Sequence, residues 1–140
     1  YPFEMVLAKV VELIQRLIKQ YDCVALFFED IQMQHNVVSF KRLAQLQGAI
    51  LLLCAQNEIL FSLITPSQWQ GYCKARGRTQ KEIKGGVTTL ALDGKKHSKV
   101  LSLEYVRDTY GVETTNDNVS DAICIGTYVV NNITIRTKGV

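Results

Sequence analysis

Apolar residues along the chain alternate between helical spacing and short continuous runs. Residues 4–20 carry two adjacent apolar stripes, which predict an amphipathic helix with a broad buried face. The run Cys23–Phe28 follows, six apolar residues bounded by charge on both sides, and helical spacing resumes at Val37. A short run between two helical patterns favours a strand buried on both faces of a parallel sheet, although its length alone leaves a helix open. The pattern predicts the α/β class.

The same reading extends over the second half of the chain. The further predicted elements are a helix at 37–56, a strand at 60–64, a helix at 66–74, a hairpin arm at 87–92, a helix at 98–110, an extended piece at 112–115 and a last helix from 116–118 to 131. Thr65, Pro66 and Gln68 form a helix start with a hydroxyl cap and an early proline. Gly111 is suited to end the helix before it.

Three of these helices carry predictions about burial. The helix 37–56 is apolar nearly all round in its second half, so it either lies deep in the core or meets a second subunit as well as the sheet, and we favour the second subunit. Trp69 is expected to pack in the core rather than to stack on a base. The core face of the last helix is predicted to comprise Val119, Ala122, Ile123, Gly126, Val129 and Val130.

Composition describes an ordinary soluble protein. With 140 residues, 47% hydrophobic and 21% charged, the chain fits one domain at 1–131 with a polar tail at 132–140. No apolar run reaches the roughly 18 residues of a membrane span, and no signal-peptide pattern is present. The four cysteines are widely spaced and mostly lie in apolar segments, which predicts buried thiols in a reducing, cytoplasmic compartment. A zinc site is not expected.

Charge is concentrated in one segment. Residues 74–99 contain eight basic and two acidic residues, whereas the rest of the chain is acidic, and the whole chain has a net charge of +3. This distribution suggests that a polyanion is bound at one place, although a solvated loop is an equal alternative. The candidate contacts are Lys74, Arg76, Arg78, Lys81, Lys84, Lys95, Lys96, His97 and Lys99.

Acidic and amide side chains mark two further places. Glu29 follows the predicted strand at 23–28, at the carboxyl end that faces the ligand crevice in such sheets, and the connection 31–36 should line this crevice. Asn118 and Asp121 are three residues apart in the last helix, so they share a face, and Asp117 is also within reach of Asp121.

Carboxylates gathered in this way bind hard divalent cations, and two ions about 4 Å apart can hydrolyse a phosphodiester. The structural alternative is that Asp117 or Asn118 only caps the helix, that Asp121 only complements its dipole, and that Glu29 is a surface residue.

At these residues the sequence resembles a known family. The segments 27–31 (FFEDI), 40–49 (FKRLAQLQGA), 65–69 (TPSQW), 95–99 (KKHSK) and 117–125 (DNVSDAICI) resemble, in order and spacing, the RuvC-type Holliday junction resolvases, and more specifically their phage-encoded relatives. The resemblance covers residues 1–131. It implies a ribonuclease-H-like mixed sheet flanked by helices.

The resemblance also implies a site and partners. RuvC-type enzymes are homodimers that nick four-way DNA junctions with Mg²⁺ or Mn²⁺ held by four acidic residues. By position, Glu29 is similar to the second ligand and Asp121 to the last. The third falls on Asn118, where the family has an acid or occasionally histidine, and Asp117 could substitute from the adjacent position. The first ligand and the first strands are expected upstream of Tyr1, and the helix 37–56 is expected to form the dimer interface.

The sequence therefore predicts a metal-dependent, structure-selective endodeoxyribonuclease that cleaves four-way junctions with two ions per site. It would act in the cytoplasm, of a bacterial host if phage-encoded, and no membrane partner is expected. The alternatives are a catalytically inactive junction-binding protein, with Asn118 in place of an acidic ligand, and an unrelated α/β domain that binds a small molecule.

Overall fold

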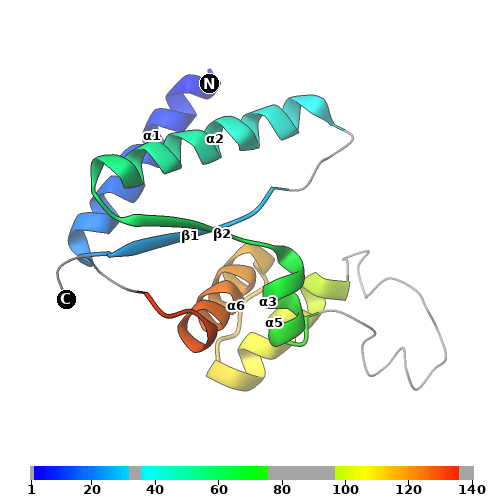
Figure 1. Cartoon of the computed structure of the whole chain (residues 1–140). Coiled ribbons are helices and arrows are strands. Elements are labelled where there is room, and N and C mark those ends of the chain that lie inside the picture. The colour runs from blue at the N-terminus through cyan, green and yellow to red at the C-terminus, as the bar shows by residue number, and fades with distance from the viewer. Residues whose placement is uncertain (1, 32–35, 76–96, 136–140) are drawn as a thin grey trace. The chain divides into compact units, whose positions relative to one another are not determined.

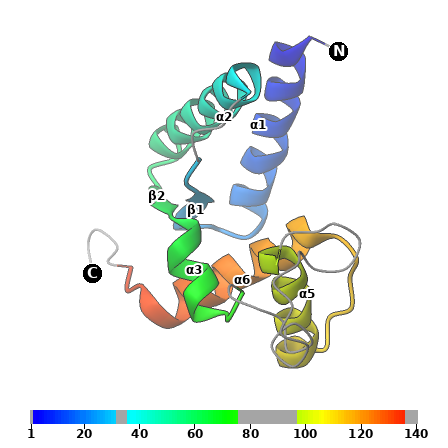
Figure 2. The same cartoon turned by 90° about the vertical axis from the view of Figure 1, so that its right-hand side faces the viewer.

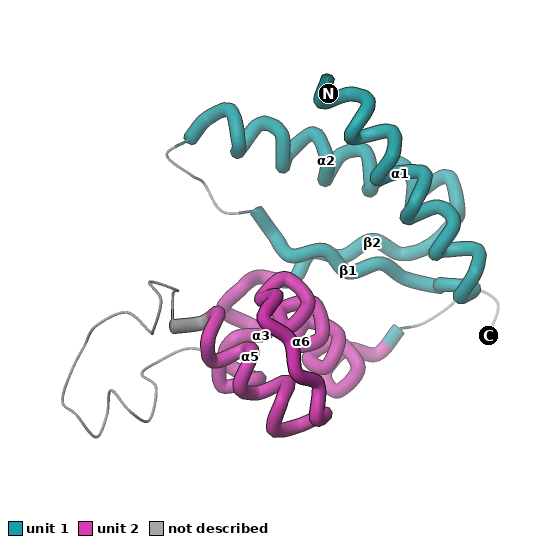
Figure 3. The backbone as a smooth tube through the Cα atoms, turned by 180° about the vertical axis from the view of Figure 1, so that it is seen from behind, with its two compact units in different colours: residues 1–64, 135–140 teal, residues 65–134 magenta. Residues whose placement is uncertain are grey.

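A computed structural model describes residues 2–31, 36–75 and 97–135 of the chain. The described elements are α1 (Phe3–Gln20), β1 (Ala25–Glu29), α2 (Val37–Gln56), β2 (Leu60–Ile64), α3 (Pro66–Tyr72), α5 (His97–Tyr110) and α6 (Asp117–Asn132) (Figure 1). They form two compact units, residues 1–64 with 135–140 and residues 65–134 (Figure 3). The predicted mixed α/β class is confirmed, and it is consistent with a ribonuclease-H-like fold. The division into one domain and a tail stays a prediction.

In the first unit, two helices lie on the same side of a parallel two-stranded sheet (Figures 1 and 2). Strand β1 pairs with β2 in a register that sets Ala25 opposite Leu60 and Glu29 opposite Ile64. Helix α2 makes the crossover between the strands and packs on both of them, and α1 packs on α2. A reciprocal amide pair joins α1 to the end of α2, because Gln15 Nε2 donates to Asn57 Oδ1 at 2.9 Å and Asn57 Nδ2 donates to Gln15 Oε1 at 2.7 Å.

The prediction that the first strand is buried on both faces is wrong for the described chain. Every residue of β1 is partly exposed, and Leu60 and Leu63 of β2 are exposed. Helices α1 and α2 cover only one face of this sheet within the first unit. The strand also begins two residues later than predicted, because Cys23 N–H still donates to Ile18 O at 3.0 Å and closes the end of α1.

Residues with a left-handed backbone conformation follow four of the described helices. Gly111 does so after α5 with φ +67°, as the sequence predicts. Asp22, Glu58 and Lys74 occupy the same position after α1, α2 and α3, with φ between 49° and 55°. After α3, Ala75 N–H donates to Gln70 O at 2.8 Å, so that helix ends at Tyr72 rather than at Lys74. Non-glycine residues give no clear sequence signal for this ending.

In the second unit, α6 packs against α5 and α3. Trp69 of α3 is only 1% exposed, which confirms its predicted place in a core. The predicted core face of α6 is largely wrong, because Val119 is 43% and Val130 is 81% exposed, and Ala122 and Gly126 are exposed as well. The residues buried instead are Ser120, Cys124, Thr127 and Val129, of which only Val129 was predicted.

Small polar side chains build this buried face. Tyr110 OH and Thr127 Oγ1 are 2.7 Å apart, and Cys73 Sγ donates to Cys124 O at 3.5 Å. The cysteines are all free, and three of them are buried. Burial raises the pKa of the Cys54, Cys73 and Cys124 thiols, so these groups stay protonated and serve as small packing residues.

Among the described helices, α2 is long and apolar enough to span a membrane by length and composition alone. Helices of soluble proteins pass the same test, and α2 carries Lys41, Arg42 and several glutamines. This feature is weak evidence and does not indicate a membrane protein.

Candidate functional site

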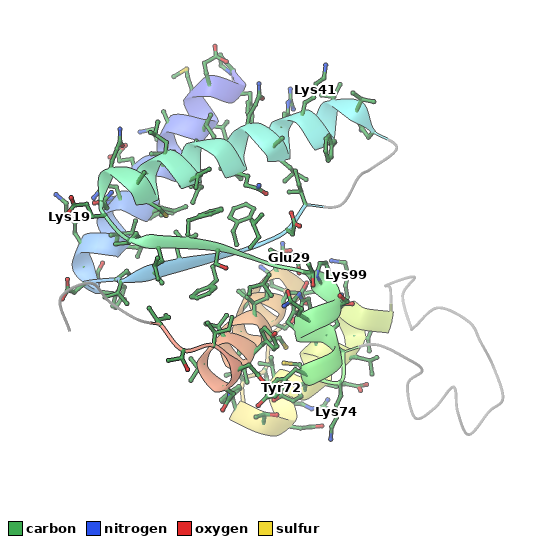
Figure 4. The ribbon with its side chains drawn as sticks, in the orientation of Figure 1. Lys19, Glu29, Lys41, Tyr72, Lys74 and Lys99 are labelled. Atoms are coloured by element: carbon green, nitrogen blue, oxygen red, sulfur yellow. The ribbon has the colours of Figure 1, made fainter. Side chains whose placement is uncertain are left out.

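Glu29 is the last residue of β1, as predicted (Figure 4). Parallel pairing sets it opposite Ile64, the last residue of β2, and Asp30 N–H donates to Ile64 O at 2.9 Å just beyond it. Glu29 is therefore held at the carboxyl edge of the sheet by its pairing with Ile64 and by the hydrogen bond just beyond it. Its side chain is partly exposed.

The first turn of α6 is capped by Asn116. The Asn116 side chain accepts a hydrogen bond from Asn118 N–H at 3.0 Å, so the alternative in which Asp117 or Asn118 is the cap is wrong. The sequence offers three adjacent residues that favour caps, Asn116, Asp117 and Asn118, and only the backbone conformation selects among them. Asp117 and Asn118 are thus the first two residues of the helix itself.

Asp117 is engaged with helix α5. Its Oδ2 lies 2.5 Å from Lys99 Nζ, and the side chains of Asp117 and Lys99 are 22% and 38% exposed. Lys99 lies in the first turn of α5 (Figure 4). A partly buried ion pair therefore joins the N-terminal turns of α5 and α6.

Asp121 lies one turn further along α6. Its Oδ1 is buried and accepts no hydrogen bond from any residue that the structure describes. Burial raises the pKa of Asp121 above its ordinary value, the Ser102 hydroxyl and the Lys99 ammonium lower it, and the charge of Asp117 raises it again. Asp117 and Asp121 are four residues apart on α6, one turn of the helix, so the charge of Asp117 acts on Asp121.

Two buried serines lie beside these charges, and they are not among the residues predicted from the sequence. Ser102 and Ser120 are fully buried, with their Oγ atoms 2.8 Å apart. Ser102 Oγ is 3.0 Å from Lys99 O, and Ser120 Oγ is 3.0 Å from Asp117 O. Each serine thus follows its charged residue by three positions, and the pair holds the two helix starts together. The matching spacing is the only sequence signal, and serine at such spacing is common on exposed helices.

Asn118 lies exposed on α6. The carboxylates at 117 and 121 share the side of the helix that meets α5, because residues four apart lie one above the other. An amide at position 118 carries no charge for a cation, and it is a weaker ligand for a hard ion than a carboxylate.

The oxygen atoms of Asp117 and Asp121 fit a hard divalent ion, and Asp121 Oδ1, which has no partner in the described part of the chain, is a donor atom that such an ion would satisfy. No group of three or more acidic, histidine or cysteine side chains gathers among the described residues. Glu29 belongs to the first unit and the α6 acids to the second, so the meeting of Glu29 with them stays a prediction.

The basic segment is described only at its ends. Lys74 is exposed after α3, where a cation also complements the helix dipole, and His97 begins α5. The predicted hairpin arm at 87–92 and most of the connection at 31–36 lie outside the described residues. So do Arg76, Arg78, Lys81, Lys84, Lys95 and Lys96.

A hollow of about 730 Å³ lies elsewhere in the second unit. It is lined by α5 and by the segment 112–115, including Val100, Leu103, Arg107 and Glu113. None of the predicted site residues that the structure describes lines it.

Comparison with known proteins gives one family. The family model described as "Crossover junction endodeoxyribonuclease RuvC" matches residues 2–128, which is more than half of the chain. No curated protein matches the chain.

Asp121→Asn should raise the stability of the metal-free protein at neutral pH. Because the folded state raises the pKa of Asp121, it binds this proton more tightly than the unfolded state, and stability falls as the pH rises above the ordinary value of 3.8. The amide removes this cost, so the melting temperature near neutral pH should rise by about 2–4 °C. The gain should vanish as the pH falls below that value.

Thermal melts followed by circular dichroism in EDTA, from acid to neutral pH, measure this effect. Asp108→Asn, at an exposed position of α5, is the matched control and should change little. A lower melting temperature of Asp121→Asn at neutral pH would contradict the conclusion that the buried Asp121 carboxylate destabilises the metal-free protein.

Proposed function

The chain belongs to the RuvC family of crossover junction endodeoxyribonucleases, and from this premise we propose that it nicks four-way DNA junctions with divalent ions held by Glu29, Asp121 and Asp117. Members of this family are Holliday junction resolvases that depend on a divalent metal, generally Mg²⁺. The observation that carries the assignment to these residues is Asp121, whose buried oxygen has no hydrogen-bond partner among the described residues and lies near a second carboxylate at the start of α6.

Each acid has a distinct part in this proposal. Glu29 supplies a carboxylate from the end of β1, and Asp121 supplies one from the second turn of α6. Asp117 takes the position next to Asn118, whose neutral amide contributes less. Two Mg²⁺ or Mn²⁺ ions, when bound, would activate a water molecule and stabilise the leaving oxygen of the phosphodiester.

The basic segment would bind the phosphates of the junction arms. Contacts of this kind position the DNA and weaken with salt, and they carry no base sequence information. The proposed contacts are Lys74, Arg76, Arg78, Lys81, Lys84, Lys95, Lys96, His97 and Lys99. A resolvase of this type would work in the cytoplasm, and in a bacterial host if the chain comes from the phage-encoded branch that it resembles.

Helix α2 is the proposed dimer interface. Lys41 points away from the sheet (Figure 4), and a stripe of exposed small and apolar residues continues along that side. The stripe comprises Ala44, Gly48, Leu51, Leu52 and Ala55, with Leu51 51% and Leu52 59% exposed. Small residues in such a stripe allow two helices to approach closely, and the exposed leucines would be buried by a second copy.

The second candidate function is a junction-binding protein that does not cut. The neutral Asn118 at a position where relatives carry an acid supports it, as does the ion pair that already occupies Asp117. Such a protein would keep the affinity for four-way DNA and lose the product.

Cleavage of a labelled synthetic four-way junction tests the leading proposal. With the protein as its gene encodes it, we expect symmetric nicks in Mg²⁺ that EDTA abolishes. Glu29→Ala and Asp121→Ala should each lower the cleavage rate at least 100-fold, because each removes a ligand, while gel-shift affinity in EDTA stays within a few-fold. Asp108→Ala, on an exposed part of α5, is the control. Cleavage by the double variant Glu29→Ala, Asp121→Ala would refute the proposed metal site.

Asn118→Asp separates the two candidates. If the chain is a working nuclease, this change should alter the rate by less than about tenfold, because residue 118 is exposed, whereas the carboxylates at 117 and 121 are partly buried. If the wild type binds junctions without product, gain of cleavage in Asn118→Asp identifies the amide as the cause. Asn132→Asp, which adds the same charge at the other end of α6, is the control.

Gly48→Leu tests the dimer. A Cβ built at Gly48 meets no atom within 4 Å, and leucine favours helix over glycine, so the fold should tolerate the change. The larger side chain should hold a second α2 away, and sedimentation should shift from dimer to monomer. Gly126→Leu is a matched control, because its Cβ also meets nothing within 4 Å and it lies on α6. A Gly48→Leu protein that remains dimeric would refute this interface.

A further inference from the structure

The ammonium group of Lys99 lies next to a carboxylate at the start of α6. Its ammonium is 2.5 Å from Asp117 Oδ2, and it also lowers the pKa of Asp121. It thus lies among the carboxylates proposed to bind metal, although the sequence suggests a contact to DNA phosphate. This ion pair would itself reduce the attraction of Lys99 for phosphate.

Two carboxylates would be neutralised by one divalent ion, whereas the single ammonium of Lys99 leaves one negative charge. Asp117 and Asp121 together carry two negative charges, and Lys99 cancels one of them. A divalent ion bound by the same oxygens would lie within a few ångströms of Nζ, where the repulsion between the two cations is large. The ammonium and the metal therefore compete for Asp117.

We propose that Lys99 is the resident counter-ion of this site: it holds Asp117 while no metal is bound, and it yields that carboxylate when a divalent ion binds. The inference rests on the proposed function, in which Asp117 and Asp121 are ligands. It makes Lys99 a positioning residue that sets the metal affinity.

The surroundings allow this exchange without a movement of the helices. The backbone of Lys99 is fixed to α5 and α6 through Ser102, whose Oγ contacts both Lys99 O and Ser120 Oγ. The lysine side chain is long and 38% exposed, so the ammonium can swing into solvent while Ser102 and Ser120 keep the two helix starts together.

Binding of Mn²⁺ to the protein without DNA tests the proposal, with free Mn²⁺ measured by electron paramagnetic resonance. Lys99→Met removes the charge and keeps most of the side-chain length, and it should bind Mn²⁺ about tenfold more tightly than the wild type. Lys99→Arg keeps the charge and should stay within about threefold. Lys19→Met, which removes a charge from exposed α1, controls for the change in net charge (Figure 4).

The direction of the change is decisive. A lysine that only supports the fold would, when removed, loosen the site and weaken Mn²⁺ binding, so weaker or unchanged binding by Lys99→Met overturns the inference. Thermal melts in EDTA verify that the Lys99→Met variant folds. If it does not fold, the same measurement is made on Lys99→Gln. If the Mn²⁺ affinity of Lys99→Met is unchanged and junction cleavage is intact, only the counter-ion role of Lys99 is refuted. If the wild type and all variants fail to bind Mn²⁺, the proposed metal site is refuted as well.

Discussion

The contact between the first turns of α5 and α6 is the constraint on which the candidate site depends. Two fully buried serines hydrogen-bond across it, and each is also close to the carbonyl of the charged residue three positions before it. The Lys99–Asp117 ion pair lies at the partly exposed edge of the same contact. Small side chains are necessary here, because they let the helices approach closely enough for the hydroxyl groups to satisfy one another. A larger apolar residue at either serine would separate the helices and pull the charges apart.

This contact between α5 and α6 explains why one carboxylate oxygen of Asp121 is buried. A helix that buried a conventional apolar face would keep a carboxylate at its edge in water, where both oxygens find partners. Here the buried face is narrow and polar, and Asp121 lies beside it with one oxygen removed from solvent and unpaired among the described residues. An arrangement of this kind costs stability in the metal-free protein, since desolvation disfavours the charged form. Proteins tolerate such costs at functional sites, and a divalent ion would offset this one by satisfying the oxygen.

Membership in the family and the geometry of α6 rest on independent observations. Membership in the RuvC family rests on a match over residues 2–128 and would hold whatever the side chains at 117, 118 and 121 were doing. The geometry of α6 rests on this chain alone, and it separates Asp117 from Asn118 in a way that position in the family pattern does not. Asp117 faces α5 with Asp121, and Asn118 is exposed. The departure from the family pattern at 118 is therefore flanked by a carboxylate that faces α5.

Local rules were enough for much of the fold. Periodicity and capping chemistry predicted α2 and β2 to the residue, the start of α3, the left-handed Gly111 and Glu29 at a strand end, because these features depend on neighbours along the chain. The buried face of α6 depends instead on which helices pack on it. Hydrophobicity pointed to Val119 and Val130, whereas packing buries Ser120, Cys124 and Thr127, and the two hydroxyl groups find partners on α5. For the same reason the ion pair of Lys99 and the buried Asp121 oxygen without a partner among the described residues follow from packing between α5 and α6, which sequence order does not determine. The cap at Asn116 is a local contact, but three adjacent residues suited to it leave the choice to the backbone conformation.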